Sequence, residues 1–274
     1  MSALAHAGTL GSLHRYPIKS MMGEELNSVQ VTPRGLFGDR AYALADSDTH
    51  RVVSAKNPKK WPGLFNFRAT YVMPPETLSE AGITPVRVTL PDGKFATTSS
   101  DDFASTMSAT LGRAVTLMTA APASAQLEEY WPDMDGLAHR DAVTDEALPA
   151  GTFFDLAVLH VLTTATLDTY RKLYPDGRFE PRRFRPNIII NTPGQSGFIE
   201  NDWIGKTIAI GPEVKIQITC PCPRCVMTTL AQGDLPKDPG ILKTAAKHNN
   251  VHIGAYASVM QPGLVRIGDA VSIV

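Results

Sequence analysis

The segment Ile218–Thr229, with the sequence ITCPCPRCVMTT, contains all three cysteines of the 274-residue chain. Alternating apolar residues in 214–218 predict a β-strand that leads into it, and residues 226–230 favour a second strand that leads out. Proline lacks a backbone N–H and fixes φ, so the residues between the cysteines are expected to form a stiff loop and not a paired central strand. Such a loop would hold at least one thiol in a fixed direction.

The cysteine segment also suggests chemistry. Arg224 precedes Cys225, and a neighbouring cation favours the thiolate, which is the form that binds metals and acts as a nucleophile. The roles of Cys220 and Cys222 are open between a zinc site, a disulfide and a redox function. Zinc normally needs four ligands, and no nearby cysteine or histidine completes a set. The spacing also permits a disulfide between Cys222 and Cys225, or a resolving role for Cys222 beside a persulfide on Cys225.

Composition excludes several classes of protein. Hydrophobic residues make up 43% of the chain and charged residues 19%, which is enough apolar material for a packed core. A net charge of −1 argues against general nucleic-acid binding. No apolar run is long enough to span a membrane, and the first residues lack the pattern of a secretory signal. The odd number of clustered cysteines favours a reducing compartment, so we expect a cytoplasmic protein.

Most of the chain has the pattern of short, closely spaced strands, which predicts a β-rich α+β protein closed as a barrel. Asp92-Gly93 predicts a hairpin turn, and Gly112 is expected to end a helix over 103–111. A second helix should begin at Thr163 or Thr164 and run to Tyr174, and a short one should cover 241–246. Residues 126–150 are expected to be irregular. The main predicted strands are 27–32, 41–45, 51–55, 86–90, 94–98, 114–119, 153–162, 188–190, 251–258, 263–267 and 270–274, and residues 205–218 are expected to form a hairpin that turns at Gly211-Pro212.

Five short motifs occur in an order that resembles one family. They are LHRYPIKS at 13–20, GDR at 38–40, RFRPN at 183–187, the pair Arg224-Cys225, and the pair Gly268-Asp269. Together they resemble MOSC-domain proteins that carry an N-terminal MOSC β-barrel domain, over roughly residues 9–274. The resemblance implies an N-terminal β-barrel-like domain over 9–122 and a MOSC-type β-barrel over 123–274.

Stand-alone bacterial MOSC proteins and the mitochondrial amidoxime-reducing component are the members that the motifs resemble most. This resemblance implies a molybdenum cofactor, Mo-molybdopterin, whose metal is ligated by one cysteine, here Cys225. It also implies reduction of small N-hydroxylated substrates, and pyridoxal phosphate binding as a family-level property. Tyr256 matches a tyrosine near the metal and is expected to act with Cys225 as a catalytic residue.

A pterin cofactor ends in a phosphate or pyrophosphate, so its anchors should be cations and small hydrogen-bond donors at strand ends. Thr163 and Thr164, at a helix start, would add backbone N–H donors. The full set of expected cofactor-binding residues is Lys19, Ser20, Arg40, Thr163, Thr164, Arg183, Arg185, Asn187 and Arg224. Lys19 and Arg40 have no obvious ion-pair partner in the sequence beyond Asp39.

Electrons are expected to come from a separate ferredoxin-, flavodoxin- or cytochrome-type protein. The three cysteines cannot ligate an iron–sulfur cluster as well as molybdenum, and no G-x-G-x-x-G fingerprint follows a predicted strand. No nucleic acid or membrane is expected as a partner. Two other functions remain open: a sulfur carrier with a persulfide on Cys225, and a module that stores the cofactor without turnover. Pro223 occupies a position where a hydroxyl residue is common in the family, which affects the expected substrate range.

Overall fold

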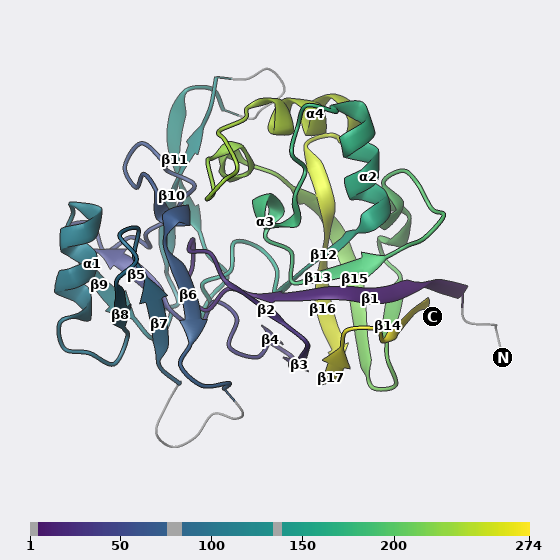
Figure 1. Ribbon diagram of the computed structural model, residues 1–274, viewed down its shortest axis with the longest axis horizontal. Coiled ribbons are helices and arrows are strands. Elements are labelled where there is room, and N and C mark those ends of the chain that lie inside the picture. The colour runs from purple at the N-terminus through teal and green to yellow at the C-terminus, as the bar shows by residue number, and fades with distance from the viewer. Residues whose placement is uncertain (1–4, 76–83, 134–138) are drawn as a thin grey trace.

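The computed structural model describes residues 5–75, 84–133 and 139–274. Seven strands form a closed barrel, because the last strand of the ring pairs with the first (Figure 1). The order around the barrel is β13-β12-β16-β15-β14-β18-β1, and only β12 and β13 pair in parallel. The predicted barrel is therefore confirmed. The strands are β1 (Ala5–Arg15), β12 (Leu159–Thr163), β13 (Ile188–Asn191), β14 (Thr207–Ile210), β15 (Val214–Pro223), β16 (His252–Gln261) and β18 (Ala270–Ile273).

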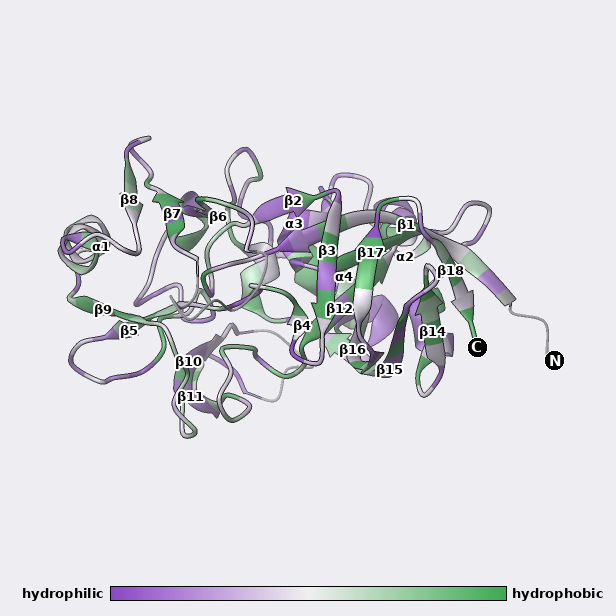
Figure 2. Ribbon diagram, turned by 90° about the horizontal axis from the view of Figure 1, so that it is seen from below, coloured by the Kyte–Doolittle hydropathy of each residue, from purple (hydrophilic) through white to green (hydrophobic). Residues whose placement is uncertain are grey.

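The barrel interior is a packed apolar core. Alternate residues of each strand point inward, as the two-residue period of a strand requires. In β15, Val214, Ile216 and Ile218 are buried while Lys215 is exposed. Apolar colour accordingly runs along the barrel strands in Figure 2. The barrel is a scaffold filled with side chains, so any ligand site must lie outside it.

A second core lies in the N-terminal part of the chain. Helix α1 (Phe103–Leu111) ends at Gly112, whose φ of 68° is left-handed, as predicted. Phe103 and Met107 of this helix pack into the core with Phe65 and Val88. The surrounding strands are β5 (Ala43–Asp46), β6 (Arg68–Tyr71), β7 (Val86–Thr89), β8 (Phe95–Thr97) and β9 (Val115–Met118). Strands β3 (Ser28–Thr32) and β4 (Gly35–Leu36) instead pack their buried residues into the barrel core.

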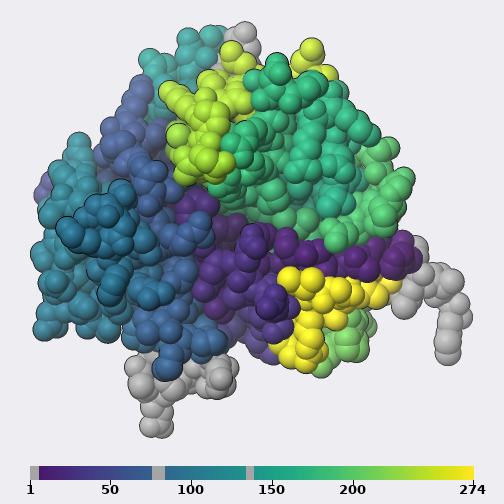
Figure 3. Space-filling model, in the orientation of Figure 1, coloured from purple at the N-terminus to yellow at the C-terminus, as the bar shows by residue number. Residues whose placement is uncertain are grey.

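The two ends of the chain lie together in space. Strand β1 belongs to the barrel, and β17 (Gly263–Arg266) pairs with β3 near the N-terminus. Figure 3 shows the C-terminal residues alongside the N-terminal strand. A short strand, β2 (Glu24–Leu26), extends β1. Because segments from each half contribute strands to the other, the proposed boundary at 122/123 stays a prediction.

Helices cover one side of the barrel. Thr163 caps α2 (Thr164–Leu173) by accepting a hydrogen bond from the Thr166 N–H, which confirms the predicted helix start. The remaining helices are α3 (Pro181–Phe184), α4 (Gly240–Asn249) and the 3-10 turns η1 (Leu64–Asn66), η2 (Ile199–Trp203) and η3 (Val226–Thr229). None of the helices in the described part of the chain is both long and apolar enough to cross a bilayer.

Three local predictions were wrong. Residues 126–150 contain a hairpin, β10 (Gln126–Trp131) paired with β11 (Ala142–Ala147); the part over 134–138 lies outside the described residues. The strand expected over 153–162 begins only at Leu159. Val52 makes isolated bridges, so 51–55 is not a regular strand. Charged residues along the β10–β11 hairpin replace the apolar alternation that would predict a strand, because its outer face is solvated.

Candidate functional site

The cysteine segment continues a strand and does not form a free loop. Strand β15 pairs with β16 through Cys220 and Pro221 to Pro223, with register shifts on both sides of Cys220 and Pro221. Strand β14 pairs only with 214–217, so the proline-containing end has a neighbour on one side alone. The expectation of a loop was therefore wrong, although this end of the strand is not a central one. Proline is tolerated here because bulges and an open edge remove the need for its missing N–H.

Cys225 lies at the end of this strand, immediately before η3. Residues 226–230 were expected to form a strand, but Val226–Thr229 form this 3-10 turn, which bends the chain away from the sheet. Cys225 is partly buried and lines a cavity of about 490 Å³. Cys222 is fully buried, and all three cysteines are free thiols. Cys225 is therefore the cysteine that can present its sulfur to a ligand in this cavity.

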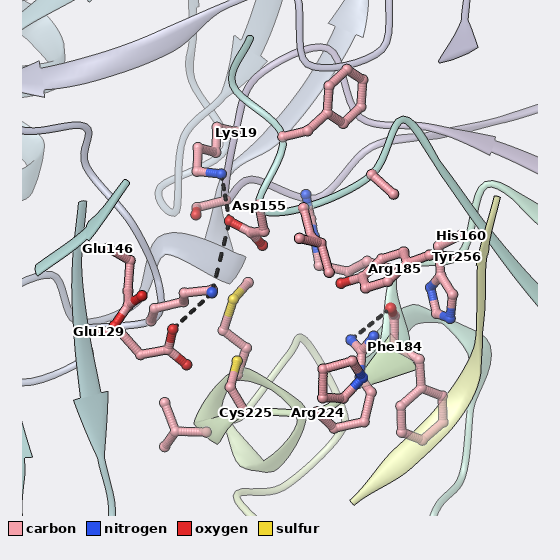
Figure 4. Close-up of a pocket in the computed structure, with 18 of the residues that line it drawn as sticks. Lys19, Glu129, Glu146, Asp155, His160, Phe184, Arg185, Arg224, Cys225 and Tyr256 are labelled. Carbon is pink, nitrogen blue, oxygen red and sulfur yellow. Dashed lines mark hydrogen bonds and ion pairs between the residues drawn. The ribbon is translucent and has the colours of Figure 1, made fainter. Parts of the chain in front are cut away.

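The cavity gathers most of the expected site residues from both halves of the chain (Figure 4). Its volume is within the range of ordinary ligand pockets. The predicted residues that line it are Lys19, Ser20, Arg40, Arg185, Asn187, Arg224, Cys225 and Tyr256. The first and last of them, Lys19 and Tyr256, are 237 positions apart in the sequence, and the fold alone brings them together.

Three predicted residues do not line this cavity. Thr163 is buried, and its N–H donates to Glu200, while Thr164 shares a hydrogen bond with Thr192. Arg183 is fully buried and donates to the carbonyl oxygens of Arg178, Thr228, Leu230 and Pro236. The geometry therefore gives these three side chains structural contacts and does not support a cofactor contact for them.

Arg183→Met should destabilise the fold. The guanidinium satisfies four backbone carbonyls that the substitution would leave without a donor, and unsatisfied buried polar groups are costly. We expect a loss of about 3 kcal/mol in the free energy of unfolding, measured by urea denaturation. Arg171→Met removes a more exposed guanidinium from the adjacent helix and is the control. Equal stability of Arg183→Met and the wild type would contradict the structural role.

Two arginines form the cationic side of the cavity. The guanidinium groups of Arg40 and Arg185 lie over the Tyr16 ring, at 4.5 and 4.1 Å from its centroid. Arg40 is ion-paired with Asp39, whereas Arg185 donates to the Met21 carbonyl at 2.6 Å. No acidic side chain in the described ranges lies within ion-pair distance of Arg185, although the residue is only 6% exposed. Burial, followed by the charge of Arg40, lowers the pKa of Arg185 to about 10.

Backbone strain is concentrated around the same cavity. Seven non-glycine residues in the described chain have positive φ, and five of them line this cavity. A positive φ disfavours most L-residues, and such residues cluster at functional sites. The five are Ser20, Arg40, Arg185, Asn250 and Val251. Asn187 fixes the same region, since its side-chain amide donates to Asp39 and accepts from the His160 N–H.

Lys19 is committed to a charged network. Its ammonium donates to the Phe153 carbonyl at 2.6 Å and to Asp155 at 2.7 Å. The absence of an obvious partner in the sequence was therefore misleading, because Asp155 is 136 positions away. Lys56 continues the network, 4.0 Å from Asp155 and 2.8 Å from Glu129. Burial lowers the pKa of Lys19 even though Asp155 opposes the shift.

The Asp155 carboxylate should stabilise the fold in a pH-dependent way. Burial opposes ionisation, but Lys19 and Lys56 outweigh it and lower the pKa of Asp155 below its ordinary 3.8. A carboxyl with a lowered folded pKa contributes stability above its unfolded pKa and loses it as pH falls through the folded value. The melting-temperature deficit of Asp155→Asn should therefore be larger at about pH 6 than at about pH 3. A deficit that grows on acidification would contradict this ion pair.

The charge of Arg224 favours the Cys225 thiolate, as expected, but larger influences oppose it. Its guanidinium donates to the Cys222 sulfur at 2.7 Å and to the Phe184 carbonyl at 2.9 Å, and so it is turned toward Cys222. Burial, followed by the charge of Glu129, raises the pKa of Cys225 to about 11 against the opposing charges of Lys56 and Arg224. At neutral pH the Cys225 thiol therefore holds its proton. A bound metal cation would have to displace that proton, as metals do from thiol ligands.

Tyr256 and His160 lie beside each other on paired strands. Their ring centroids are 5.9 Å apart, and both residues line the cavity. Burial raises the pKa of Tyr256, so its hydroxyl is protonated and can donate a hydrogen bond. Burial also lowers the pKa of His160 to about 3, so its ring is neutral, with Nε2 3.0 Å from the Ile253 carbonyl.

Sequence reasoning missed several cavity residues. Asp155 follows Phe153 and Phe154, and an acidic residue directly after two apolar ones can indicate a site residue. The predicted strand over 153–162 included Asp155, so this indication was overlooked. Lys56 and Glu129 have no motif around them, and they pair only through the fold. The missed residues with polar side chains include Lys56, Glu129, Glu146, Asp155 and His160.

The chemistry of these residues fits an anionic, metal-bearing cofactor. Arg185 is buried without an acidic partner, and the buried Nε of Arg224 has no hydrogen-bond partner in the described chain. The Cys225 sulfur completes the set as a soft ligand. Within the described ranges, no group of three or more histidine, cysteine or acidic side chains could hold a metal ion.

Comparison with known proteins identifies the class. The MOSC domain model matches residues 151–272, and the MOSC N-terminal beta barrel domain model matches residues 7–130. The chain therefore belongs to the family of MOSC-domain proteins with an N-terminal MOSC β-barrel domain. This is the family that the sequence motifs predicted.

Two curated relatives are named mitochondrial amidoxime reducing component 2. The protein from Rattus norvegicus is 24% identical over 98% of this chain and 84% of its own length, and the one from Bos taurus is 24% identical with the same coverage. Among solved structures, the YUAD protein of Bacillus subtilis superposes with a TM-score of 0.48 at 10% identity, over 97% of this chain and 94% of that chain. YiiM of Geobacillus stearothermophilus gives a TM-score of 0.34 at 13% identity, over 57% of this chain and 75% of that chain.

Proposed function

We propose that this protein binds a molybdenum cofactor through Cys225 and reduces small N-hydroxylated substrates with electrons from a separate protein. The observation that carries the proposal is that Cys225 lines the same cavity as Arg185. Arg185 is buried and has no acidic side chain within ion-pair distance in the described ranges. Family membership and the name of the amidoxime-reducing relatives support the same reaction class.

Each residue has a defined task in this proposal. Cys225 binds the metal, and Arg40 and Arg185 hold the anionic end of the cofactor. When bound, the cofactor supplies two-electron redox chemistry at an oxygen-accepting metal. Reduction of an N–OH group to N–H consumes two electrons and two protons and releases water. Tyr256, whose hydroxyl keeps its proton, would donate a hydrogen bond to the substrate oxygen.

Turnover should require an external electron donor. A reduced viologen dye should support reduction of a model amidoxime by the purified chain, whereas NADH and NADPH should not. The reason is that no nicotinamide-binding fingerprint follows a strand in this sequence. The measurement is product amidine formed with each donor, with heat-denatured protein as the control. Steady NADPH-dependent turnover by the isolated chain would contradict this electron supply.

A sulfur carrier is the second candidate, because the Cys225 sulfur faces a cavity that could admit a sulfur donor. We favour metal binding, because the cationic side of the cavity formed by Arg40 and Arg185 suits an anionic cofactor, which a sulfur carrier does not require. Cyanide-labile sulfur in the purified protein, found without molybdenum, would reverse this preference.

A further inference from the structure

The β10–β11 hairpin forms one wall of the cavity and has two unlike faces. Side chains alternate across a strand, so Thr144 and Glu146 share the face that is partly buried, while Asp145 points to the exposed face. On the facing strand, Glu129 and Trp131 share the inward face. Glu129, Trp131 and Glu146 all line the cavity.

The acids of this cavity differ in how their charge is balanced. Asp155 is paired with Lys19 at 2.7 Å, and Glu129 is paired with Lys56 at 2.8 Å. No cationic side chain in the described part of the chain lies within 4.0 Å of Glu146. Glu146 therefore presents a carboxylate to the cavity without a matching protein cation.

A hydrogen-bonded chain holds this carboxylate in place. The Trp131 indole N–H donates to the Thr144 hydroxyl oxygen at 2.8 Å, and the Thr144 hydroxyl donates to Glu146 at 2.7 Å. The hydrogen bonds fix both the carboxylate and the indole ring in the cavity wall. A carboxylate beside an aromatic ring is a favourable environment for an organic cation, which gains from the charge and from the ring face.

The wall lies across Cys225 from the arginines. In Figure 4, Glu129 and Glu146 are on one side of Cys225, and Arg185 and Arg224 are on the other. The arginine side suits the anionic cofactor, and the acidic side is left for substrate. Building on the function proposed above, we propose that Glu146 and Trp131 bind a cationic group that the substrate carries apart from its N–OH, such as an ammonium.

The test uses two substrates of the same shape. Para-(aminomethyl)benzamidoxime carries an ammonium where para-ethylbenzamidoxime carries a methyl group. With viologen as donor, the wild type should prefer the cationic substrate by about tenfold in kcat/KM, since one charged contact contributes about that factor. Glu146→Gln should remove most of this preference by raising KM for the cationic substrate. Asp145→Asn, which removes the same charge from the exposed face, should keep the preference.

Binding provides a readout that does not need turnover. Trp61 and Trp203 are buried in the cores, so Trp131 is the tryptophan whose fluorescence should respond to a ligand in the cavity. Titration of the purified protein without reductant should show tighter binding of the cationic amidoxime, and Trp131→Phe should lose the signal. If neither compound is reduced but the cationic one binds more tightly, the proposed reaction fails and the cation site stands. Equal binding and equal kcat/KM for both compounds would overturn the cation site alone.

Discussion

Cys225→Ser should lose N–O reduction by at least about a hundredfold while remaining folded. The change replaces one sulfur with oxygen in a partly buried side chain, so packing is nearly preserved. An alcohol stays protonated near neutral pH and is a poor ligand for a soft-ligand metal site. The assay is viologen-driven turnover of an amidoxime, together with circular dichroism of each variant.

The neighbouring cysteines provide matched controls. Cys220→Ser removes a sulfur that does not line the cavity and should keep most activity. Cys222→Ser should keep the metal ligand but weaken the contact that orients Arg224, so a modest loss is expected. A folded Cys225→Ser protein with wild-type turnover would contradict the ligand assignment. Complete loss in Cys222→Ser alone would move the reactive sulfur three residues upstream.

Arg185→Met should lower cofactor content by about tenfold or more while the cofactor-free protein keeps most of its stability. A bidentate arginine–phosphate contact contributes a few kcal/mol to binding, about 2 or more, and methionine cannot replace it. The buried guanidinium has no acidic partner in the described chain and donates to one backbone carbonyl, that of Met21, so its loss should cost much less stability than the loss of Arg183, which donates to four carbonyls. Molybdenum per protein and urea denaturation measure the two effects.

Arg183 gives the opposite outcome two positions away. Both arginines are buried, but Arg183 is surrounded by backbone carbonyls and lies outside the cavity. Arg183→Met should lose stability, with cofactor content reduced only in proportion to the folded fraction. If Arg185→Met instead loses several kcal/mol of stability with full cofactor content, Arg185 is a structural residue and the anchor role is wrong.

Arg185→Met is expected to affect cofactor binding more than stability, and the structure gives a different physical reason for this than the sequence does. The sequence alone predicts a pocket-lining arginine that adds little to folding because water screens its charge. Arg185 is in fact 6% exposed and lies over Tyr16. The expected separation between cofactor binding and stability therefore follows from its single backbone carbonyl acceptor and the lack of an acidic partner among the described residues.

The alternation of apolar and polar residues along the sequence predicted the barrel, because it indicates which residues of each strand face inward. The alternation in 214–218 and the N-cap at Thr163 each correspond to one element, and each was confirmed. The motifs around Lys19, Arg40 and Asn187 located residues that meet in one cavity. Their convergence follows from the family resemblance, since no local pattern joins segments so far apart.

The wrong and missed predictions arise where contacts with distant parts of the chain decide the structure. The residues between the cysteines were expected to form a loop, but a proline is acceptable in a strand that has one neighbour and a bulge. The β10–β11 hairpin carries charge on both faces, because its inner face lines a polar cavity as well as a small core around Leu127. Asp155 and Lys56 are recognisable as site residues only through contacts with distant partners.

Molybdenum content of the purified protein tests the central claim most directly. We predict molybdenum and pterin in a ratio near one per chain in the wild type, measured by elemental analysis and by fluorescence of the oxidised pterin. Cys225→Ser should reduce the metal strongly, whereas Cys220→Ser should retain it. Wild-type protein that stays free of molybdenum and pterin after expression in cofactor-producing cells would contradict the account.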